Sequence, residues 1–316
     1  MSKKIAVVIV NWNAGTLLLR CLDALEKQTR LADKIIIVDN ASSDDSLEQV
    51  KKQYPNVDFL QQGYNSGFAV ANNAAFKVLK DFEWITLLNP DAFPEPEWIA
   101  NLLHAAANNP EYSHFASRML SANEPHLLDG VGDCYFSNGR MQRRGYRKPA
   151  HQNFLHAEAV FSPCAGAAMY RSSILSEVGG FDEDFFCYCE DVDLGFRLQL
   201  AGYRCLYVPN AIVHHIGSAI SGPESDFTFY YGHRNLVWTY FKNMPGWTFW
   251  RFLPAHIITN IGFIIWFAYR GRGKVMVRAK FDAIKGLPKM WRKRRHIQAN
   301  RKVQPSSILK LLSKNL

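Results

Sequence analysis

The chain has 316 residues, 48% of them apolar, which is enough for one large or two small domains with a real core and excludes a disordered chain. Its formal net charge of +9 is unevenly placed, because residues 270–316 hold 15 Lys and Arg against the single acid Asp282. Six cysteines without CxxC spacing exclude the usual zinc knuckle and predict free thiols in a reducing compartment. The apolar run Ile5–Val10 is shorter than the core of a secretory leader, so a cytoplasmic protein is expected.

The first part of the chain alternates between apolar runs and helical patterns. The runs at 5–10, 34–38, 57–61 and 84–88 predict buried strands. The segments between them predict helices over 16–28, from the polar loop 39–46 to residue 52, and over 69–80. This alternation predicts an α/β fold, in which a mostly parallel central sheet with right-handed crossovers is flanked by helices.

Polar side chains follow three of these strands. In such sheets ligands bind beyond the carboxyl ends of the strands, so the polar residues there are candidates for one shared site. They are Asn11 and Asn13, Asp39 and Asn40, and Asn89 and Asp91. The first loop lacks G-x-G-x-x-G, which argues against a dinucleotide dehydrogenase. The alternative is that these residues only form turns and helix caps.

The tripeptide Asn89-Pro90-Asp91 is the sharpest of these signals. An acid in a stiff turn after an apolar strand presents oxygen to a hard divalent cation. Proteins usually hold Mg²⁺ or Mn²⁺ with one or two carboxylates together with substrate phosphates. Asp91 is therefore a candidate metal ligand. The alternative is an Asx turn or a type I turn.

The middle of the chain is less regular. A helix is predicted over 93–109, with Pro94 and Pro96 at its start, and a short helix over 171–178. The basic segment 140–148 is interpreted either as a mobile flap over an anionic substrate or as a solvated loop. The small residues of 163–170 predict a strand that passes close to a ligand or to another backbone.

The segment 179–204 carries the strongest chemical signal. Aromatic residues within 181–188 precede three acids, Glu190, Asp191 and Asp193, at the start of a predicted helix that ends at Gly202. A carboxylate beside aromatic rings is expected to have a raised pKa, which suits a general base. The alternative is a well-capped helix, whose acids face the positive end of the helix dipole and whose Asp193 pairs with Arg197.

Two strands and an aromatic helix are predicted after Gly202. The strands span 203–208 and 211–215, and the second ends at His214 and His215, which either bind the metal or the phosphates or are structural. The helix runs from 230 to 242 and carries Arg234, which either binds a phosphate or lies at the surface.

The C-terminal part is apolar and aromatic first, then basic. The longest uncharged run within 247–269 is 252–269, which is marginal for spanning a bilayer. Aromatic stretches followed by basic helices favour the surface of an anionic membrane. Nucleic-acid binding is the competing interpretation of the charge, but the Trp, Phe and Ile of this segment are not needed for it, so no nucleic-acid partner is expected.

Seven ordered motifs carry a resemblance to a known family. They are VVIVNWNAG (7–15), VDNASSDDS (38–46), NSGFAVANN (65–73), LLNPDA (87–92), GGFDEDFFCYCEDVDLGFRLQLAGYR (179–204), HHIGSAIS (214–221) and YYGHRNLVWTYFKNMP (230–245). The chain resembles family-2 glycosyltransferases of the GT-A fold, in particular the bacterial rhamnosyltransferase-like branch. The resemblance covers roughly residues 5–295, and several ordered motifs are far more specific than one.

The resemblance implies a nucleotide-sugar donor and a transfer that inverts the anomeric centre. Val10 and Asn11 would lie against the donor nucleotide. Asp39 would hydrogen-bond the pyrimidine base, and Asn65 and Gly67 would line the nucleotide pocket.

The resemblance also assigns the chemistry. Asn89 and Asp91 stand at the D-x-D metal motif of the family, with Asp91 as the ligand. Asp191 stands at the catalytic base, and its neighbour Glu190 would help to orient the acceptor. Two departures blur the donor identity: Asn89 replaces the first acid of the motif, and Asn72 stands where many relatives have Arg.

Together these features predict a metal-dependent glycosyltransferase with a GT-A (Rossmann-like) domain over 1–245 and an aromatic, basic helical extension over 246–316. The expected donor is dTDP-L-rhamnose, with UDP-sugars second, and the expected acceptor is a hydroxyl of a lipid-linked or cell-envelope glycan. The extension would bind the inner face of the cell membrane as a peripheral element. One alternative is a non-catalytic nucleotide- or glycan-binding module. A third possible function is that of a nucleotidyltransferase, but such an enzyme would need a Gly-rich first loop, which this chain lacks.

Overall fold

The computed structural model describes residues 4–217 and 225–313. A ten-stranded sheet forms its centre. The strands follow along it in the order β10 (Glu158–Val160), β12 (Arg204–His215), β6 (Tyr112–Ser121), β11 (Ala167–Arg171), β4 (Trp84–Leu88), β1 (Ile5–Asn11), β2 (Lys34–Asp39) and β3 (Asp58–Gln61). Two short strands, β5 (Ala92–Pro94) and β7 (Leu128–Gly130), pair with β12 and β6. The fold class predicted from the sequence is thereby confirmed.

The N-terminal half of the sheet is parallel. β1 pairs in parallel with both β2 and β4, and β2 pairs in parallel with β3. The residues of β1 from Ile5 to Ile9 are fully buried, which explains why this part of the strand is apolar throughout. The connecting helices are α1 (Thr16–Glu26), α2 (Ser46–Gln53) and α3 (Gly67–Val78). The carboxyl ends of β1, β2 and β4 therefore lie at one edge, where the polar motifs meet.

The other half of the sheet is mixed. β11 runs antiparallel to β4 and β6, whereas β12 runs parallel to β6. The helix predicted from Phe93 is wrong at its start: Ala92–Pro94 is a strand paired with β12, and the helix α4 spans Trp98–Asn108. Proline favours extended backbone before it and donates no hydrogen bond, so Pro94 and Pro96 delay the helix.

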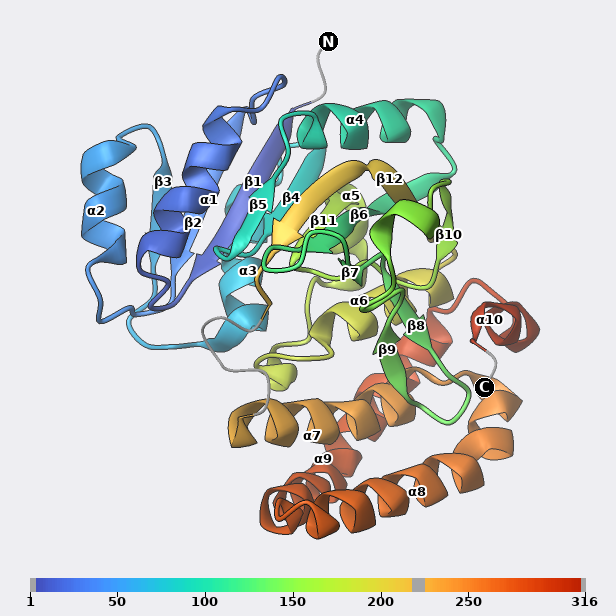
Figure 1. The fold of residues 1–316 in the computed structure, drawn as a ribbon. Coiled ribbons are helices and arrows are strands. Elements are labelled where there is room, and N and C mark those ends of the chain that lie inside the picture. The colour runs from blue at the N-terminus through green and yellow to red at the C-terminus, as the bar shows by residue number, and fades with distance from the viewer. Residues whose placement is uncertain (1–3, 218–224, 314–316) are drawn as a thin grey trace.

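Two further predictions needed correction. The strands expected on either side of Pro209 are one strand, β12, with a register shift between Val208 and Ile212. The basic segment 140–148 is not a simple solvated loop, because Met141–Arg143 forms strand β9, paired with β8 (Asp133–Tyr135). This hairpin reaches from the sheet toward the C-terminal helices (Figure 1).

The segment 179–204 folds as predicted around helix α6 (Glu190–Leu200). Gly202 ends the helix: its N–H donates to the carbonyl of Gln199, and Tyr203 donates to Leu198, the two bonds of a Schellman motif. The short helices α5 (Ser172–Val178) and η2 (Glu183–Phe185) precede α6, and η1 (Ala150–Gln152) follows the β8–β9 hairpin.

Four helices complete the chain. They are α7 (Asp226–Asn243), α8 (Gly246–Tyr269), α9 (Gly273–Ala299) and α10 (Pro305–Leu311). α9 packs along α7, where the Nε1 of Trp238 donates to the carbonyl of Ala283 at 2.9 Å, and α8 lies outermost in Figure 1. Among the described residues, α8 is long and apolar enough to cross a bilayer by length and composition, and the rest of the protein buries little of it.

Candidate active site

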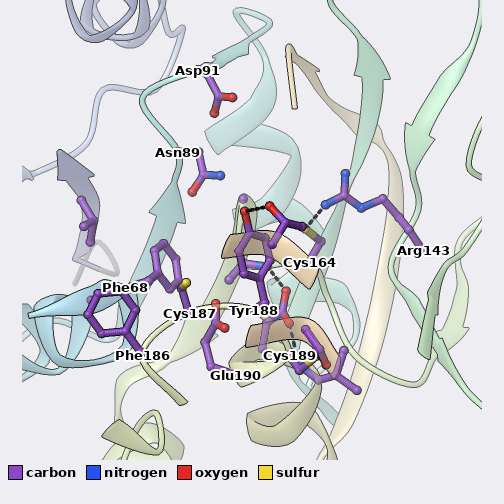
Figure 2. Close-up of a pocket in the computed structure, with 18 of the residues that line it drawn as sticks. Phe68, Asn89, Asp91, Arg143, Cys164, Phe186, Cys187, Tyr188, Cys189 and Glu190 are labelled. Atoms are coloured by element: carbon purple, nitrogen blue, oxygen red, sulfur yellow. Dashed lines mark hydrogen bonds between the residues drawn. The ribbon is translucent and has the colours of Figure 1, made fainter. Parts of the chain in front are cut away.

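A cavity of about 470 Å³ opens beyond the carboxyl ends of β1 and β4. Figure 2 shows Asn89 and Asp91 at one end of it, Glu190 at the other, and Arg143 reaching in from the side. Its lining includes most of the predicted site residues: Val10, Asn65, Gly67, Asn89, Asp91, Glu190, Asp191 and His215. Sequence segments far apart in the chain thus meet at one site of a size typical for small-molecule ligands.

One wall of the cavity, which we call the strand wall, is formed by Val10, Asn40, Asn65 and Gly67. The amide of Asn40 donates to the side-chain oxygen of Asn65 at 3.0 Å and accepts from the backbone N–H of Ser66 at 2.9 Å. The backbone N–H of Gly67 also donates to Asn65 at 3.0 Å. Gly67 has a φ of 84°, and a Cβ there would lie 2.5 Å from the ring of Phe186, so no larger residue fits.

Asn11 and Asp39 support the strand wall and are not among the residues that line this cavity, so their expected contacts with the nucleotide stay a prediction. Both are buried, and the Nδ2 of Asn11 donates to the Oδ1 of Asp39 at 2.9 Å. Asp39 also accepts the backbone N–H of Ser42 at 3.1 Å. These bonds hold the loop after β2 against the loop after β1, so both residues position the site.

The metal candidates Asp91 and His215 meet at the end of the cavity. The Nε2 of His215 lies 3.3 Å from the Oδ1 of Asp91, and its Nδ1 lies 2.8 Å from the Oδ2 of Asp129. Burial lowers the pKa of His215, but the hydrogen bonds with Asp129 and Asp91 outweigh it and raise that pKa to about 8. The same oxygen of Asp129 accepts from Arg143 at 2.6 Å. Asp129 thereby ties the imidazole to the β9 strand.

Three carboxyl groups form the opposite side, which we call the acid wall: Asp133, Glu190 and Asp191. Burial raises the pKa of each, and the negative charge of Asp191 adds to the rise at Asp133 and Glu190. Asp191 accepts the backbone N–H of Ala165 at 3.1 Å and that of Val192 at 2.8 Å. One buried oxygen each of Asp133 and Glu190 has no hydrogen-bond partner among the described residues. The predicted rise in the pKa of the acids is confirmed.

The loop before the acids is held in unusual backbone geometry. Phe186, Tyr188 and Cys189 have φ values of 66°, 64° and 65°, in the left-handed region that L-residues rarely adopt. The amide nitrogen of Asn235 lies within 2.9 Å of the carbonyls of Phe185, Cys187 and Tyr188 and holds this conformation. The strain is concentrated where Glu190 and Asp191 begin helix α6.

Arg234 does not line the cavity, so the structure gives no support for the expected phosphate contact. Its Nη2 donates to the carbonyls of Asp184 and Phe185 at 3.0 Å, and its guanidinium lies 4.2 Å from the ring centroid of Trp238. These contacts use the guanidinium to fix the loop from α7. Arg234 therefore stabilises the loop that precedes Glu190 and Asp191, without reaching the cavity itself.

The third acid of the motif, Asp193, is structural. Its carboxylate is fully buried and accepts from Arg197 at 2.9 Å, Asn243 at 2.7 Å and Lys242 at 2.7 Å. The predicted pair with Arg197 is confirmed. Lys242 also contacts Asp182 at 2.5 Å, so this buried network joins α6, α7 and the loop between α5 and η2.

Sequence reasoning missed Asp129 and Asp133, and it identified Arg143 only as part of the basic segment 140–148. They lie on β7, β8 and β9, in the segment that shows no clear periodicity. The basic run around Arg143 was the available signal, but only the hairpin pairing brings this side chain to the cavity. Burial raises the pKa of Cys164, Cys187 and Cys189, which disfavours the thiolate form that a nucleophilic cysteine needs.

Relatives of known function resemble this chain over most of its length. It is 30% identical over 244 residues to the N-acetylglucosaminyl-diphospho-decaprenol L-rhamnosyltransferase of Mycobacterium tuberculosis, covering 68% of this chain and 77% of the relative. It is also 30% identical over 188 residues to the rhamnosyltransferase WbbL of Escherichia coli K12, covering 56% and 70%.

Solved structures share the fold at low sequence identity. The mannosyltransferase PcManGT of Pyrobaculum calidifontis, solved with GDP-Man and Mn²⁺, has a TM-score of 0.57 at 16% identity over 98% of this chain and 86% of that one. GalNAc-T7, solved with UDP, GalNAc and Mn²⁺, has a TM-score of 0.61 at 16% identity over 75% of this chain and 47% of that one. The chain thus spans about half of the GalNAc-T7 chain. Residues 3–244 match the family described as glycosyltransferase like family 2, so the chain belongs to the family-2 glycosyltransferases and resembles their rhamnosyltransferases.

Proposed function

We propose that the protein transfers a sugar from a nucleotide-sugar donor to an acceptor hydroxyl with inversion at the anomeric carbon. One observation carries the proposal: a single cavity holds the Asp91–His215 pair at one end and the buried acids Glu190 and Asp191 on the opposite wall. A leaving diphosphate needs positive charge, and an attacking hydroxyl needs a base. In the proposed displacement, the diphosphate leaves toward Asp91 and His215 while Asp191 accepts the proton of the attacking hydroxyl.

The donor we propose is dTDP-L-rhamnose, with UDP-sugars as the second choice. The support is that the two relatives described above, each 30% identical to this chain, are both named as rhamnosyltransferases. In this chain Val10, Asn40 and Asn65 offer the polar and apolar surface for the nucleotide. Asn11 and Asp39 keep that surface in place through the buried hydrogen bonds behind it.

A divalent cation, Mg²⁺ or Mn²⁺, fits the end of the cavity. The Nδ1 of His215 faces Asp129, as in carboxylate–histidine–metal arrangements, and its Nε2 lies 3.3 Å from Asp91. Metal binding would displace the Nε2 proton, because a metal-bound imidazole is neutral. Asp91 and His215 would hold the ion, with Asn89 beside them and the donor phosphates supplying further oxygens. The bound ion would neutralise negative charge on the diphosphate.

Asp191 is the proposed base. Its raised pKa makes it a stronger base than an ordinary aspartate, and the N–H groups of Ala165 and Val192 fix its orientation. The acceptor oxygen forms its bond to the anomeric carbon as the bond from that carbon to the diphosphate oxygen breaks. The hydroxyl proton passes to Asp191, and Glu190 orients the acceptor beside it.

The proposed acceptor is a lipid-linked or cell-envelope glycan, and the proposed location is the cytoplasmic face of the cell membrane. The support is the exposed apolar α8 with the basic α9 behind it. The Mycobacterium tuberculosis relative is named for a decaprenyl-diphosphate-linked acceptor. The C-terminal helices would hold the cavity close to such a lipid.

The test is donor binding and slow donor hydrolysis across dTDP-, UDP- and GDP-sugars, with and without Mn²⁺ or Mg²⁺. We expect one donor to bind in a metal-dependent way, and Asp91→Ala to abolish that dependence. Asp191→Asn is expected to bind the donor normally but to lose transfer. Binding of no nucleotide by the folded wild type would refute the proposal and favour a non-catalytic module.

A further inference from the structure

A second cavity lies between the first turns of α8 and the last turns of α9. Its volume is about 560 Å³. Three tryptophans and three arginines line it: Trp247, Trp250, Trp291, Arg294, Arg295 and Arg301. We call it the Trp/Arg cleft. No acid lines the cleft, and from residue 227 to residue 316 the sequence contains Asp282 as its only acid.

Helical spacing builds both walls of the cleft. Trp247 and Trp250 are three residues apart and share one face of α8, while Trp291, Arg294 and Arg295 share one face of α9. Arg294 forms a fixed floor: its Nη1 donates to the carbonyls of Phe241 at 3.1 Å and Met244 at 2.5 Å, and its guanidinium lies 4.4 Å from the ring centroid of Phe249.

The other two arginines have donors to spare. The Nη1 of Arg301 is buried and has no hydrogen-bond partner among the described residues. Arg295 is exposed and forms no ion pair or hydrogen bond within residues 4–217 and 225–313. Leaving a buried N–H without an acceptor costs about 1–3 kcal/mol, which an anionic oxygen would recover. Guanidinium groups bind phosphate in particular, because their paired N–H groups match two phosphate oxygens.

The cleft is continuous with an apolar surface. Trp247 and Trp250 also begin the exposed face of α8, which continues through Ile258 and Ile265 to Tyr269. Tryptophan is enriched where a protein meets the headgroups of a bilayer, and basic residues beside it are attracted to anionic lipids. A second copy of the chain fits this surface less well, because two such basic surfaces would repel one another.

We propose that the Trp/Arg cleft binds the phosphate headgroup of an anionic phospholipid while the exposed face of α8 lies in the membrane interface. Arg295 and Arg301 contact the phosphate, and the indoles of Trp247 and Trp250 lie at the headgroup level. The inference deepens the proposed membrane location, and it rests on that part of the proposed function.

The first test is sedimentation of the full chain with vesicles of phosphatidylcholine containing about 30% phosphatidylglycerol. The double variant R295Q/R301Q is expected to bind about a hundredfold more weakly than wild type, because it loses charge-assisted hydrogen bonds as well as charge. The control R270Q/K274Q removes the same charge from the junction of α8 and α9, at the other end of α8, and is expected to lose about tenfold. Equal losses in the two variants would show diffuse attraction and overturn the site.

The second test does not depend on a variant that folds. Dihexanoyl phosphatidylglycerol below its micelle concentration is titrated into the wild-type chain, and the indole N–H signals are followed by NMR. Saturable shifts at Trp247, Trp250 and Trp291 support the cleft. The absence of shifts, or equal shifts with inorganic phosphate at the same concentration, would overturn a lipid site. A wild-type dimer that forms without vesicles and blocks vesicle binding would also overturn it.

Turnover of the nucleotide sugar reports separately on the proposed function. R295Q/R301Q is expected to keep wild-type donor hydrolysis in the absence of vesicles, because neither arginine lines the active-site cavity. A wild type that hydrolyses no donor but binds vesicles through the cleft would refute the proposed enzyme and leave the cleft supported. A wild type that hydrolyses a donor but does not bind vesicles through the cleft would refute only the proposed lipid site.

Discussion

On the strand wall of the active-site cavity the polar side chains bind one another, whereas on the acid wall three carboxyl groups crowd together with few donors. The side-chain oxygen of Asn65 accepts from Asn40 and Gly67, and that of Asn40 accepts from Ser66. Glu190 and Asp133 each keep a buried oxygen without a partner among the described residues. The hydrogen-bonded side chains of the strand wall keep their arrangement without a ligand. On the acid wall the charged carboxylates are disfavoured by burial, so these groups readily take up a proton.

The largest effect that would sharpen this comparison is expected at Asp191. Asp191→Asn removes the proposed base but keeps the size and one carbonyl oxygen of the side chain, so kcat should fall by about a thousandfold. Donor affinity, measured by calorimetry with an unreactive donor, should stay within about twofold of wild type. Glu183→Gln in the preceding loop is the control and should keep kcat. An Asp191→Asn protein with wild-type turnover would remove Asp191 as the base.

The pH dependence tests the same acid in the unmodified enzyme. Burial raises the pKa of Asp191, and only the deprotonated carboxylate accepts a proton. Transfer, measured as kcat/KM, should therefore decrease as the pH falls through that raised value. The decrease should set in at a higher pH than the ordinary aspartate value of 3.8 allows. A profile that stays flat down to that ordinary value would contradict the assignment.

The next effect is expected at Asp129, whose carboxylate holds His215 and Arg143. Asp129→Asn should weaken Mn²⁺ binding by about tenfold to a hundredfold, because partners of a ligating histidine tune its orientation and basicity. Mn²⁺ binding is measured by electron paramagnetic resonance without donor. The control is Asp45→Asn, because Asp45 is an exposed acid that is distant in the sequence from Asp129. Unchanged Mn²⁺ affinity in Asp129→Asn would show that this carboxylate does not support metal binding.

A smaller effect is expected on the strand wall. Asn40→Ala leaves the backbone N–H of Ser66 and the amide of Asn65 without their present partner, so it should destabilise the fold by about 1–3 kcal/mol. Chemical denaturation measures the change, and the exposed Asn108→Ala should have little effect. A stable Asn40→Ala protein with normal donor affinity would show that the strand wall does not depend on this network.

The smallest effect has the opposite sign and lies on the acid wall. Burial raises the pKa of Glu190 above its ordinary 4.5, so folding takes up a proton in the pH range between the two values. The protonated form is therefore the stable one, and stability falls as the pH rises through the raised pKa. Glu190→Gln should stabilise the protein by about 1 kcal/mol at pH 8 and by less at pH 5, as thermal unfolding would show. If Glu190→Gln destabilised the protein at pH 8, the inference that the charged form of Glu190 is disfavoured on the acid wall would be wrong.

The sequence by itself determined the parallel half of the fold and the positions of the main chemical groups. The run 5–10 of β1 is apolar because the strand is buried on both faces, and Gly202 ends its helix by local hydrogen bonding. Asp91, Asp191 and Glu190 were identified from short motifs, and all three line the cavity. These features are local, and local sequence specifies them.

Only the tertiary structure decided which side chains reach the cavity. Asn11, Asp39 and Arg234 lie in fitting motifs but are not among the residues that line the cavity. Asn11 donates to Asp39, Asp39 accepts from Ser42, and Arg234 donates to the loop carbonyls of Asp184 and Phe185. Asp129, Asp133 and Arg143 come from short strands that carry no periodic signal. Contacts with segments further along the chain, such as those of Asp129 with His215 and of Arg143 with Cys164, bring them to the site. Burial, which sets the pKa of the acids, is likewise a property of the packed chain, because neighbours far along the sequence exclude the water.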